Sequence, residues 1–153
     1  MGLFSFFKKR EFFSAKDKEQ IVQAIRLAEK ETSGEIRIYI ESKNAYMDAI
    51  DRAGEIFFRL QMQKTDDRNA VIVYLAVKDH QLAVFGDEGI HAKVGQEYWN
   101  REVAQMISSF NKEDYAEGIR QCVADIGEAL HKHFPFENDT DKNELPDDIV
   151  FGN

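Results

Sequence analysis

The sequence predicts an α/β protein in which helices sandwich a small mixed central β-sheet, with the elements in the order α-β-α-β-β-α-α. Residues 35–41 alternate between isoleucine and mostly polar side chains, which is the period of a β-strand. Residues 70–77 are apolar on both faces, as expected of a strand in the middle of a sheet. Four other segments carry apolar residues at helical spacing. With 153 residues, of which 43% are hydrophobic, the chain is long enough for one domain with its own core.

The first helix begins at a recognisable sequence signal. Residues 14–17, SAKD, combine an N-cap serine with an acid three positions later, close to a capping box, and Phe13 is placed to act as a hydrophobic staple. A strand follows at residues 35–41. We expect its isoleucine face to be buried and the face with Glu35, Arg37 and Glu41 to be solvated.

The remaining elements follow from apolar spacing and turn residues. We expect helices at about 47–63, 96–110 and 113–133, strands at 70–77 and 81–86, and a loop at 87–95. Because a helix joins the strands 35–41 and 70–77, they should run parallel. A two-residue turn at Asp79-His80 would pair residues whose numbers sum to about 159, and would place Arg68 opposite His91.

The two chain ends differ in composition from the rest. We divide the chain into an aromatic and basic arm at 1–11, a domain at 12–134 and an acidic tail at 135–153. The arm has too short an apolar run for a signal peptide, and the sequence has no run of about 18 apolar residues that would predict a transmembrane segment. We therefore expect a cytoplasmic protein. Residues 3–10 would suit weak contact with a membrane surface or an unknown protein partner. Cys122, the single cysteine, is expected in the core.

Charge narrows the classes of partner. The net charge of −8 argues against nucleic acid, whose binding depends on Lys and Arg, and is compatible with divalent cations. The sequence contains no P-loop, GxGxxG, GxSxG or HExxH motif. Residues 139–143 imitate the start of an EF-hand loop, but Glu144 stands where that loop needs glycine. His131 and His133 are expected to interact with a helix dipole rather than with zinc.

The predicted topology gathers acidic residues at one edge of the sheet. The starts of two parallel strands and the end of the antiparallel third strand meet there. The residues with side-chain oxygen donors at this edge are Glu35, Asp66, Asp67, Asn69, Asp87 and Glu88. Such residues persist by staying solvated, by pairing with a base such as Arg68 or Lys93, or by sharing a cation. Ca²⁺ and Mg²⁺ prefer these oxygen ligands.

Three segments stand in a characteristic order: FFSAKDKEQIVQAIRLAEKETSGEIRIYI, RNAVIVYLAVKDHQLAVFGDEGI and FNKEDYAEGIRQCVADIG. Together they resemble the TPM domain, a module found in photosystem II repair proteins of the thylakoid lumen and in many bacterial proteins. The resemblance covers about residues 12–134. In the third segment, Phe110, Tyr115 and Gly118 follow a pattern usual for the family.

The resemblance implies an α/β sandwich that binds a divalent cation, often calcium, in loops at one end of the sheet. The positions that match are Glu35, residues 66–69, and Asp87-Glu88. Some members are described as acid phosphatases. The sequence departs from the family pattern at Ala70 and His80, and two acids separate Gly86 from Gly89. From the acidic edge and the resemblance together, we expect a calcium-binding accessory or interaction module. A metal-dependent acid phosphatase and a metal-independent partner- or membrane-binding module remain alternatives.

Overall fold

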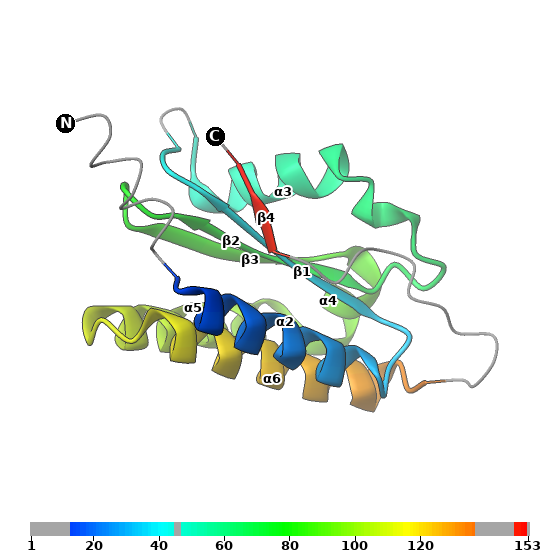
Figure 1. Ribbon diagram of the computed structural model, residues 1–153. Helices are drawn as coiled ribbons and strands as arrows, with labels where there is room; N and C mark the ends of the chain where they lie inside the picture. The colour runs from blue at the N-terminus through cyan, green and yellow to red at the C-terminus, as the bar shows by residue number, and fades with distance from the viewer. Residues whose placement is uncertain (1–12, 45–46, 137–148, 153) are drawn as a thin grey trace.

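A computed structural model describes residues 13–44, 47–136 and 149–152, which form a four-stranded mixed sheet covered by helices (Figure 1). The strands are β1 (Glu35–Glu41), β2 (Ala70–Ala76), β3 (Gln81–Gly86) and β4 (Ile149–Phe151), in the spatial order β3-β2-β1-β4. The helices are α2 (Ala15–Glu29), α3 (Ala49–Arg59), α4 (Glu88–Val94), α5 (Gln96–Asn111) and α6 (Tyr115–His133), with a 3-10 turn η1 (Met62–Lys64). Helices α2, α5 and α6 cover one face and α3 covers the other (Figure 1). The predicted fold class is confirmed.

The start of α2 is formed as its sequence predicts. The Ser14 hydroxyl accepts a hydrogen bond from the backbone N–H of Asp17 at 3.0 Å, and the Asp17 carboxylate accepts one from the backbone N–H of Ser14 at 3.4 Å. Phe13, just before the cap, is buried in the core between the sheet and helices α2, α5 and α6. Cys122 lies in the same core, as expected.

The strand pairing confirms the predicted directions but corrects one register. Strands β1 and β2 are parallel, with Glu35 opposite Ala70. Strands β2 and β3 are antiparallel, but Val71 lies opposite Gly86, so paired residue numbers sum to 157 rather than 159. The turn between β2 and β3 therefore has four residues, 77–80, rather than two. Val77 does not pair with β3, because its backbone N–H donates to the Glu41 carbonyl at the end of β1. The predicted opposition of Arg68 and His91 is therefore wrong.

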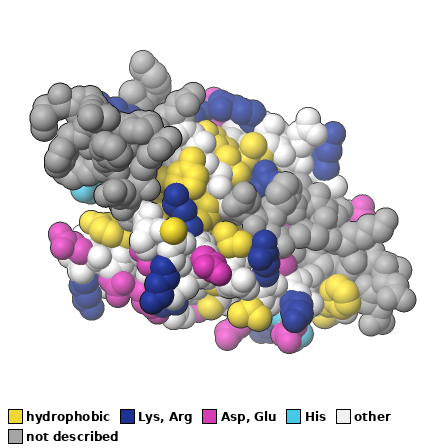
Figure 2. All heavy atoms as spheres, in the orientation of Figure 1, with side chains coloured by type: hydrophobic (Ala, Val, Ile, Leu, Met, Phe, Trp, Pro, Cys, Tyr) yellow, Lys and Arg dark blue, Asp and Glu magenta, His cyan; other side chains and the backbone are white. Residues whose placement is uncertain are grey.

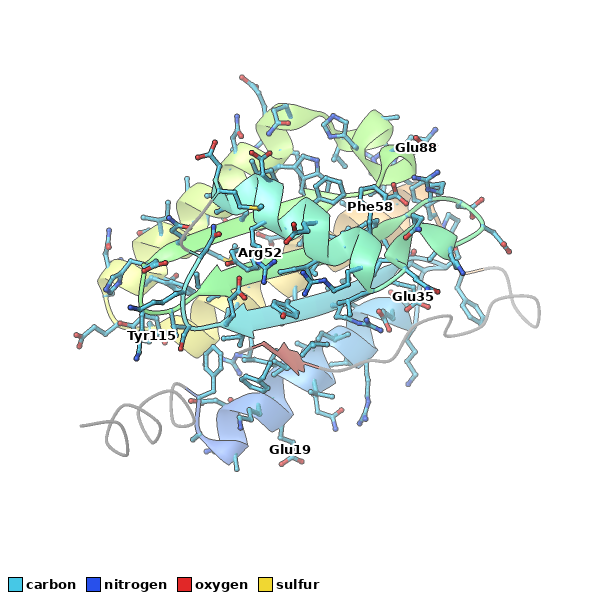
Figure 3. The ribbon with its side chains drawn as sticks, turned by 90° about the horizontal axis from the view of Figure 1, so that it is seen from above. Glu19, Glu35, Arg52, Phe58, Glu88 and Tyr115 are labelled. Carbon is cyan, nitrogen blue, oxygen red and sulfur yellow. The ribbon has the colours of Figure 1, made fainter. Side chains whose placement is uncertain are left out.

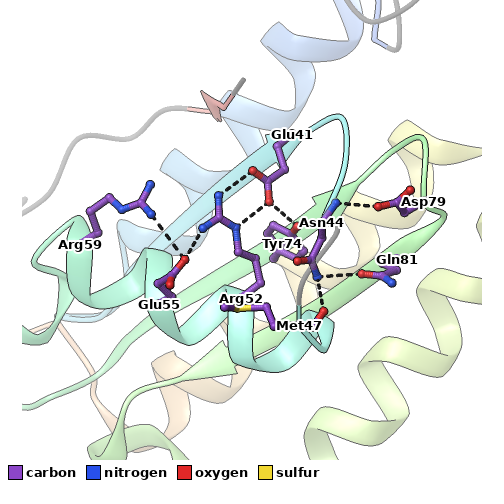
Figure 4. A network of polar contacts seen from close by, with 9 residues as sticks. All are labelled: Glu41, Asn44, Met47, Arg52, Glu55, Arg59, Tyr74, Asp79 and Gln81. Atoms are coloured by element: carbon purple, nitrogen blue, oxygen red, sulfur yellow. Dashed lines mark hydrogen bonds and ion pairs between the residues drawn. The ribbon is translucent and has the colours of Figure 1, made fainter.

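The polar face of β1 is buried, which corrects the expectation of a solvated face. Glu35, Arg37 and Glu41 are 2%, 5% and 3% exposed. Helix α3 covers this face, because its apolar residues Ala53, Ile56 and Phe57 pack against it and against the same side of β2. Buried charges need partners. Arg52 of α3 donates to both carboxylate oxygens of Glu41 at 2.8 Å (Figure 4). The Tyr74 hydroxyl also donates to one of these oxygens.

The expected loop at 87–95 is wrong, because residues 88–94 form the short helix α4. Asp87 caps this helix, accepting a hydrogen bond from the Glu88 backbone N–H at 2.8 Å. Gly95, with a φ of +81°, then separates α4 from α5. The C-terminal tail contributes β4, which pairs parallel with β1.

Several expectations concern residues outside the described ranges. These are the arm at 1–11, the surface contact at 3–10 and the EF-hand imitation at 139–143. In the part of the chain that is described, no helix is long and apolar enough to cross a membrane. On the face shown in Figure 2, basic and acidic side chains are interspersed over the helices rather than gathered into a patch of one sign.

Candidate functional site at the acidic end of the sheet

The predicted meeting of three strand ends is present in the backbone. Glu35 lies opposite Ala70 at the start of the parallel pair, and the backbone N–H of Asp87 donates to the carbonyl of Ala70 at 2.9 Å. Figure 3 shows Glu35 and Glu88 at the same end of the molecule, with Tyr115 at the opposite end. The fold therefore brings the acidic segments to one end, as the topology argument predicts.

Arg68 neutralises one part of this end. Its guanidinium contacts both carboxylate oxygens of Asp87, at 2.7 and 2.9 Å, and one oxygen of Glu88 at 3.2 Å. The hydrogen bonds to Asp87 raise the pKa of Arg68. Asp87 is almost fully buried while Glu88 is exposed, so the two-pronged contact with Asp87 is the better shielded of the two. The expectation that Arg68 neutralises part of the acidic cluster agrees with this geometry.

The loop before β2 supplies a second group of oxygen atoms. The Asn69 side-chain N–H donates to the Ser33 hydroxyl at 3.1 Å, and that hydroxyl lies 3.5 Å from a carboxylate oxygen of Asp67. Asn69 is only 1% exposed, and its side-chain carbonyl oxygen Oδ1 is buried without a hydrogen-bond partner. A buried acceptor of this kind normally finds a donor or an ion.

The two oxygen groups touch through the backbone. A Cβ atom added to Gly89 would lie 2.0 Å from the Asp67 carbonyl oxygen and 2.6 Å from that of Arg68. The backbone N–H of Gly89 donates to the Arg68 carbonyl at 2.8 Å. Only glycine permits this approach, so Gly89 holds the start of α4 against the 66–69 loop.

The predicted ligand residues are thus brought to one end but not into one cage. Asp87 and Glu88 contact Arg68, Asp67 and Asn69 adjoin Ser33, and Asp66 is exposed. Glu35 is buried on the face that α3 covers. Within residues 13–44, 47–136 and 149–152, no three Asp, Glu, His or Cys side chains are grouped so that they could hold a metal ion. The donors are of the kind that Ca²⁺ takes, but their full convergence would require Arg68 to move.

His91, which is not among the predicted ligand residues, has a definite partner in the structure. The indole N–H of Trp99 donates to His91 Nδ1 at 3.0 Å. Both rings line a hollow beside β3, together with Phe58 of α3 and the Arg68–Asp87 pair. The neighbouring Glu88 also lines it. The sequence did not predict this hollow because the hairpin register, which decides which residues flank β3, was assigned incorrectly.

Comparison with known proteins identifies the family. The model of the TPM domain matches residues 7–129. This chain belongs to the TPM domain family. Among solved structures, the NMR structure of the BA42 protein from the psychrophilic bacterium Bizionia argentinensis is 37% identical, with a TM-score of 0.84 over 92% of this chain and 96% of that chain.

A more distant structure supports the fold alone. The N-terminal domain of the cg2496 protein from Corynebacterium glutamicum is 14% identical, with a TM-score of 0.60 over 90% of this chain and 80% of that chain. No curated protein sequence matches this TPM domain. The family and the fold are therefore established, and the role of the acidic end is a matter for proposal.

Proposed function

We propose that this TPM domain binds a divalent cation, Ca²⁺ in preference to Mg²⁺, at the acidic end of its sheet and serves an accessory or interaction role. The observation that carries the proposal is the unpartnered Oδ1 atom of buried Asn69, a residue whose side-chain N–H contacts the Ser33 hydroxyl next to Asp67. Ca²⁺ accepts amide, hydroxyl and carboxylate oxygens and completes its shell with water, whereas Mg²⁺ demands stricter geometry.

Arg68 determines how many carboxylates take part. Its guanidinium satisfies Asp87 and Glu88 without any metal, so a cation that used these carboxylates would compete with Arg68. A narrow site would use Asp67, Asn69 and water, and would leave the Arg68 contacts intact. A wide site would add Asp87 and Glu88 and displace Arg68.

Binding is tested by titrating chelator-treated protein with CaCl₂ and MgCl₂, using calorimetry and amide NMR shifts. We expect saturable Ca²⁺ binding with shifts in residues 66–69. Asp67→Asn should weaken it about tenfold or more, since even residues behind a metal ligand contribute 10–100-fold. The control is Asp51→Asn, an exposed acid on α3. The absence of saturable binding, or equal effects of the two substitutions, would contradict the proposal.

The width of the site is tested in a second pair of variants. Arg68→Gln removes a nearby positive charge and should raise Ca²⁺ affinity in either case. Adding Asp87→Asn to Arg68→Gln separates the two arrangements. A further loss of affinity of about tenfold would indicate the wide site, and unchanged affinity would indicate the narrow one.

The two alternative functions give different results. In an acid phosphatase, a phosphoryl group held by Arg68 would have to replace its contacts with Asp87 and Glu88. Hydrolysis of p-nitrophenyl phosphate that is lost in Asp87→Asn and retained in Asp51→Asn would favour the enzyme. Binding to a membrane surface or a partner through residues 3–10 remains a prediction, and it would persist in the presence of a chelator.

A further inference from the structure

A second cavity lies outside the acidic end, where α4, α5 and α6 meet. It has a volume of about 560 Å³, and its walls include Tyr98, Glu102 and Asp125. None of the residues of the proposed cation site lines it. The hydroxyl of Tyr98 donates to the backbone carbonyl of Asp125 at 2.9 Å, which joins α5 to α6 at the cavity wall. The wall is thus fixed by contacts between two long helices.

The unusual group in this cavity is the carboxyl of Glu102. Glu102 is 4% exposed, on the side of α5 that also buries Trp99 and Met106. Its Oε1 atom is buried without a hydrogen-bond partner. Burial, and then the charge of Asp125, raise the pKa of Glu102 to about 8. Near neutral pH this carboxyl therefore holds a proton, in a position where a cation could take the place of that proton.

The charges of the cavity are arranged by depth. Glu102 is buried and Asp125 is partly buried, while Lys93, Lys132 and one acid, Glu128, line the same cavity and are exposed, so the exposed groups keep a net positive charge. The inner part therefore favours a cationic group, and the mouth favours an anionic one. A simple cation would be repelled by the two lysines on entry, and a simple anion would be repelled by the two acids inside.

The donor set argues against a divalent metal here. Of the three acids that line the cavity, Glu102 and Asp125 are the less exposed ones and Glu128 is exposed, and no metal-binding group of three Asp, Glu, His or Cys occurs among the described residues. An ammonium group, in contrast, needs only a few hydrogen-bond acceptors for its three N–H bonds. Two carboxyls and a cavity of this size suit a small organic ligand.

We propose that this cavity binds a small zwitterion, with its ammonium group directed to Glu102 and Asp125 and its carboxylate or phosphate group beside Lys93 and Lys132. The cationic end replaces the proton that Glu102 otherwise holds. This site is independent of the cation site at the acidic end.

Binding is tested on the full chain by amide NMR and calorimetry. The probes are 4-aminobutanoate, 6-aminohexanoate and arginine, with hexylamine and hexanoate as ligands that carry one charge. We expect saturable shifts in residues 93–102 and 125–133 with at least one zwitterion, and affinity at least about tenfold above that of either singly charged ligand. No saturable shift with any probe, or equal binding of hexylamine, would overturn the proposal.

Glu102→Gln provides the decisive variant, because glutamine keeps the shape and the hydrogen-bonding capacity but cannot carry the charge. This substitution should lower the affinity for the zwitterion about tenfold or more. The control is Glu97→Gln, which changes an exposed acid on the same helix and should leave the affinity unchanged. Unchanged binding by Glu102→Gln would overturn the assignment.

Proton release gives a readout that a merely structural role would not change. The pKa of Glu102 also depends on Asp125 and Cys122 of α6 and on Arg101 of α5. To isolate the contribution of Glu102, proton release on ligand binding is measured for wild type and Glu102→Gln by calorimetry in buffers of different ionisation enthalpy. Wild type should release a proton on binding and Glu102→Gln should release none. Equal release by both would contradict the role of Glu102.

Discussion

The buried carboxyl of Glu102 makes a strong prediction about stability and pH. Its pKa is raised from an ordinary 4.5 to about 8 in the folded protein. Between these two values the folded state binds more protons than the unfolded state, so the free energy of unfolding should fall as pH rises. The stabilising contribution is fully present below about pH 4.5 and is lost as pH rises through 8.

The magnitude follows from the size of this difference. Each unit of pKa corresponds to about 1.36 kcal/mol, so the change from 4.5 to about 8 sets a ceiling of roughly 5 kcal/mol. Between about pH 5 and pH 7 the ceiling is roughly 2.7 kcal/mol. Because the cavity admits water that partly solvates the charged form, we expect a loss of about 1–2 kcal/mol over this interval.

Urea denaturation of wild type and Glu102→Gln at a series of pH values measures this contribution. Glutamine cannot titrate, so the stability of the variant relative to wild type should rise by about 1–2 kcal/mol between about pH 5 and pH 7. Glu97→Gln should follow the wild-type curve. Parallel curves for wild type and Glu102→Gln would refute the reasoning, because they would show that Glu102 titrates alike in the folded and unfolded chains.

Two further substitutions test the buried ion pair and the backbone contact. Arg52→Met should destabilise the protein by about 2–3 kcal/mol in urea, because Glu41 would be left buried without its partner. Arg52→Met combined with Glu41→Leu should recover most of this loss, and an equally unstable double variant would contradict the explanation. Gly89→Ala should destabilise by about 1–3 kcal/mol and shift the amide signals of residues 66–69, since its Cβ would lie 2.0 Å from the Asp67 carbonyl oxygen. Unchanged stability and unchanged signals would refute that contact.

The strand β1 shows both the reach and the limit of sequence patterns. Alternation correctly predicts a strand and separates its two faces, but it does not say what covers each face. The missing information was in β2, whose apolar residues on both faces imply that both are covered. Since β1 pairs with β2 from Glu35 to Glu41, the cover extends over the polar face of β1 as well. Combining the two strands would have predicted buried partners for Glu41.

The predictions for residues 88–94 and for the hairpin register were wrong because contacts between distant segments decide both features. The residues 88–94 form a helix of two turns that contains a glycine, and intrinsic propensity disfavours such a helix. Its glycine is required by the approach of the Asp67 carbonyl, which is a tertiary contact between distant segments. In the hairpin, Val77 pairs with the end of β1 rather than with β3. No local pattern distinguishes these two partners.

Three of the four buried carboxyls among the described residues, those of Glu41, Asp87 and Glu102, have different surroundings. Glu41 has Arg52 and Asp87 has Arg68, each through two hydrogen bonds. Glu102 instead has an unpartnered oxygen, a raised pKa and a cavity beside it. An apolar residue of similar volume would serve packing at least as well as a buried carboxyl that must hold a proton. The arrangement at Glu41 is sufficiently explained by folding, whereas the unpartnered Oε1 atom of Glu102 beside a cavity is the observation from which the zwitterion proposal is argued.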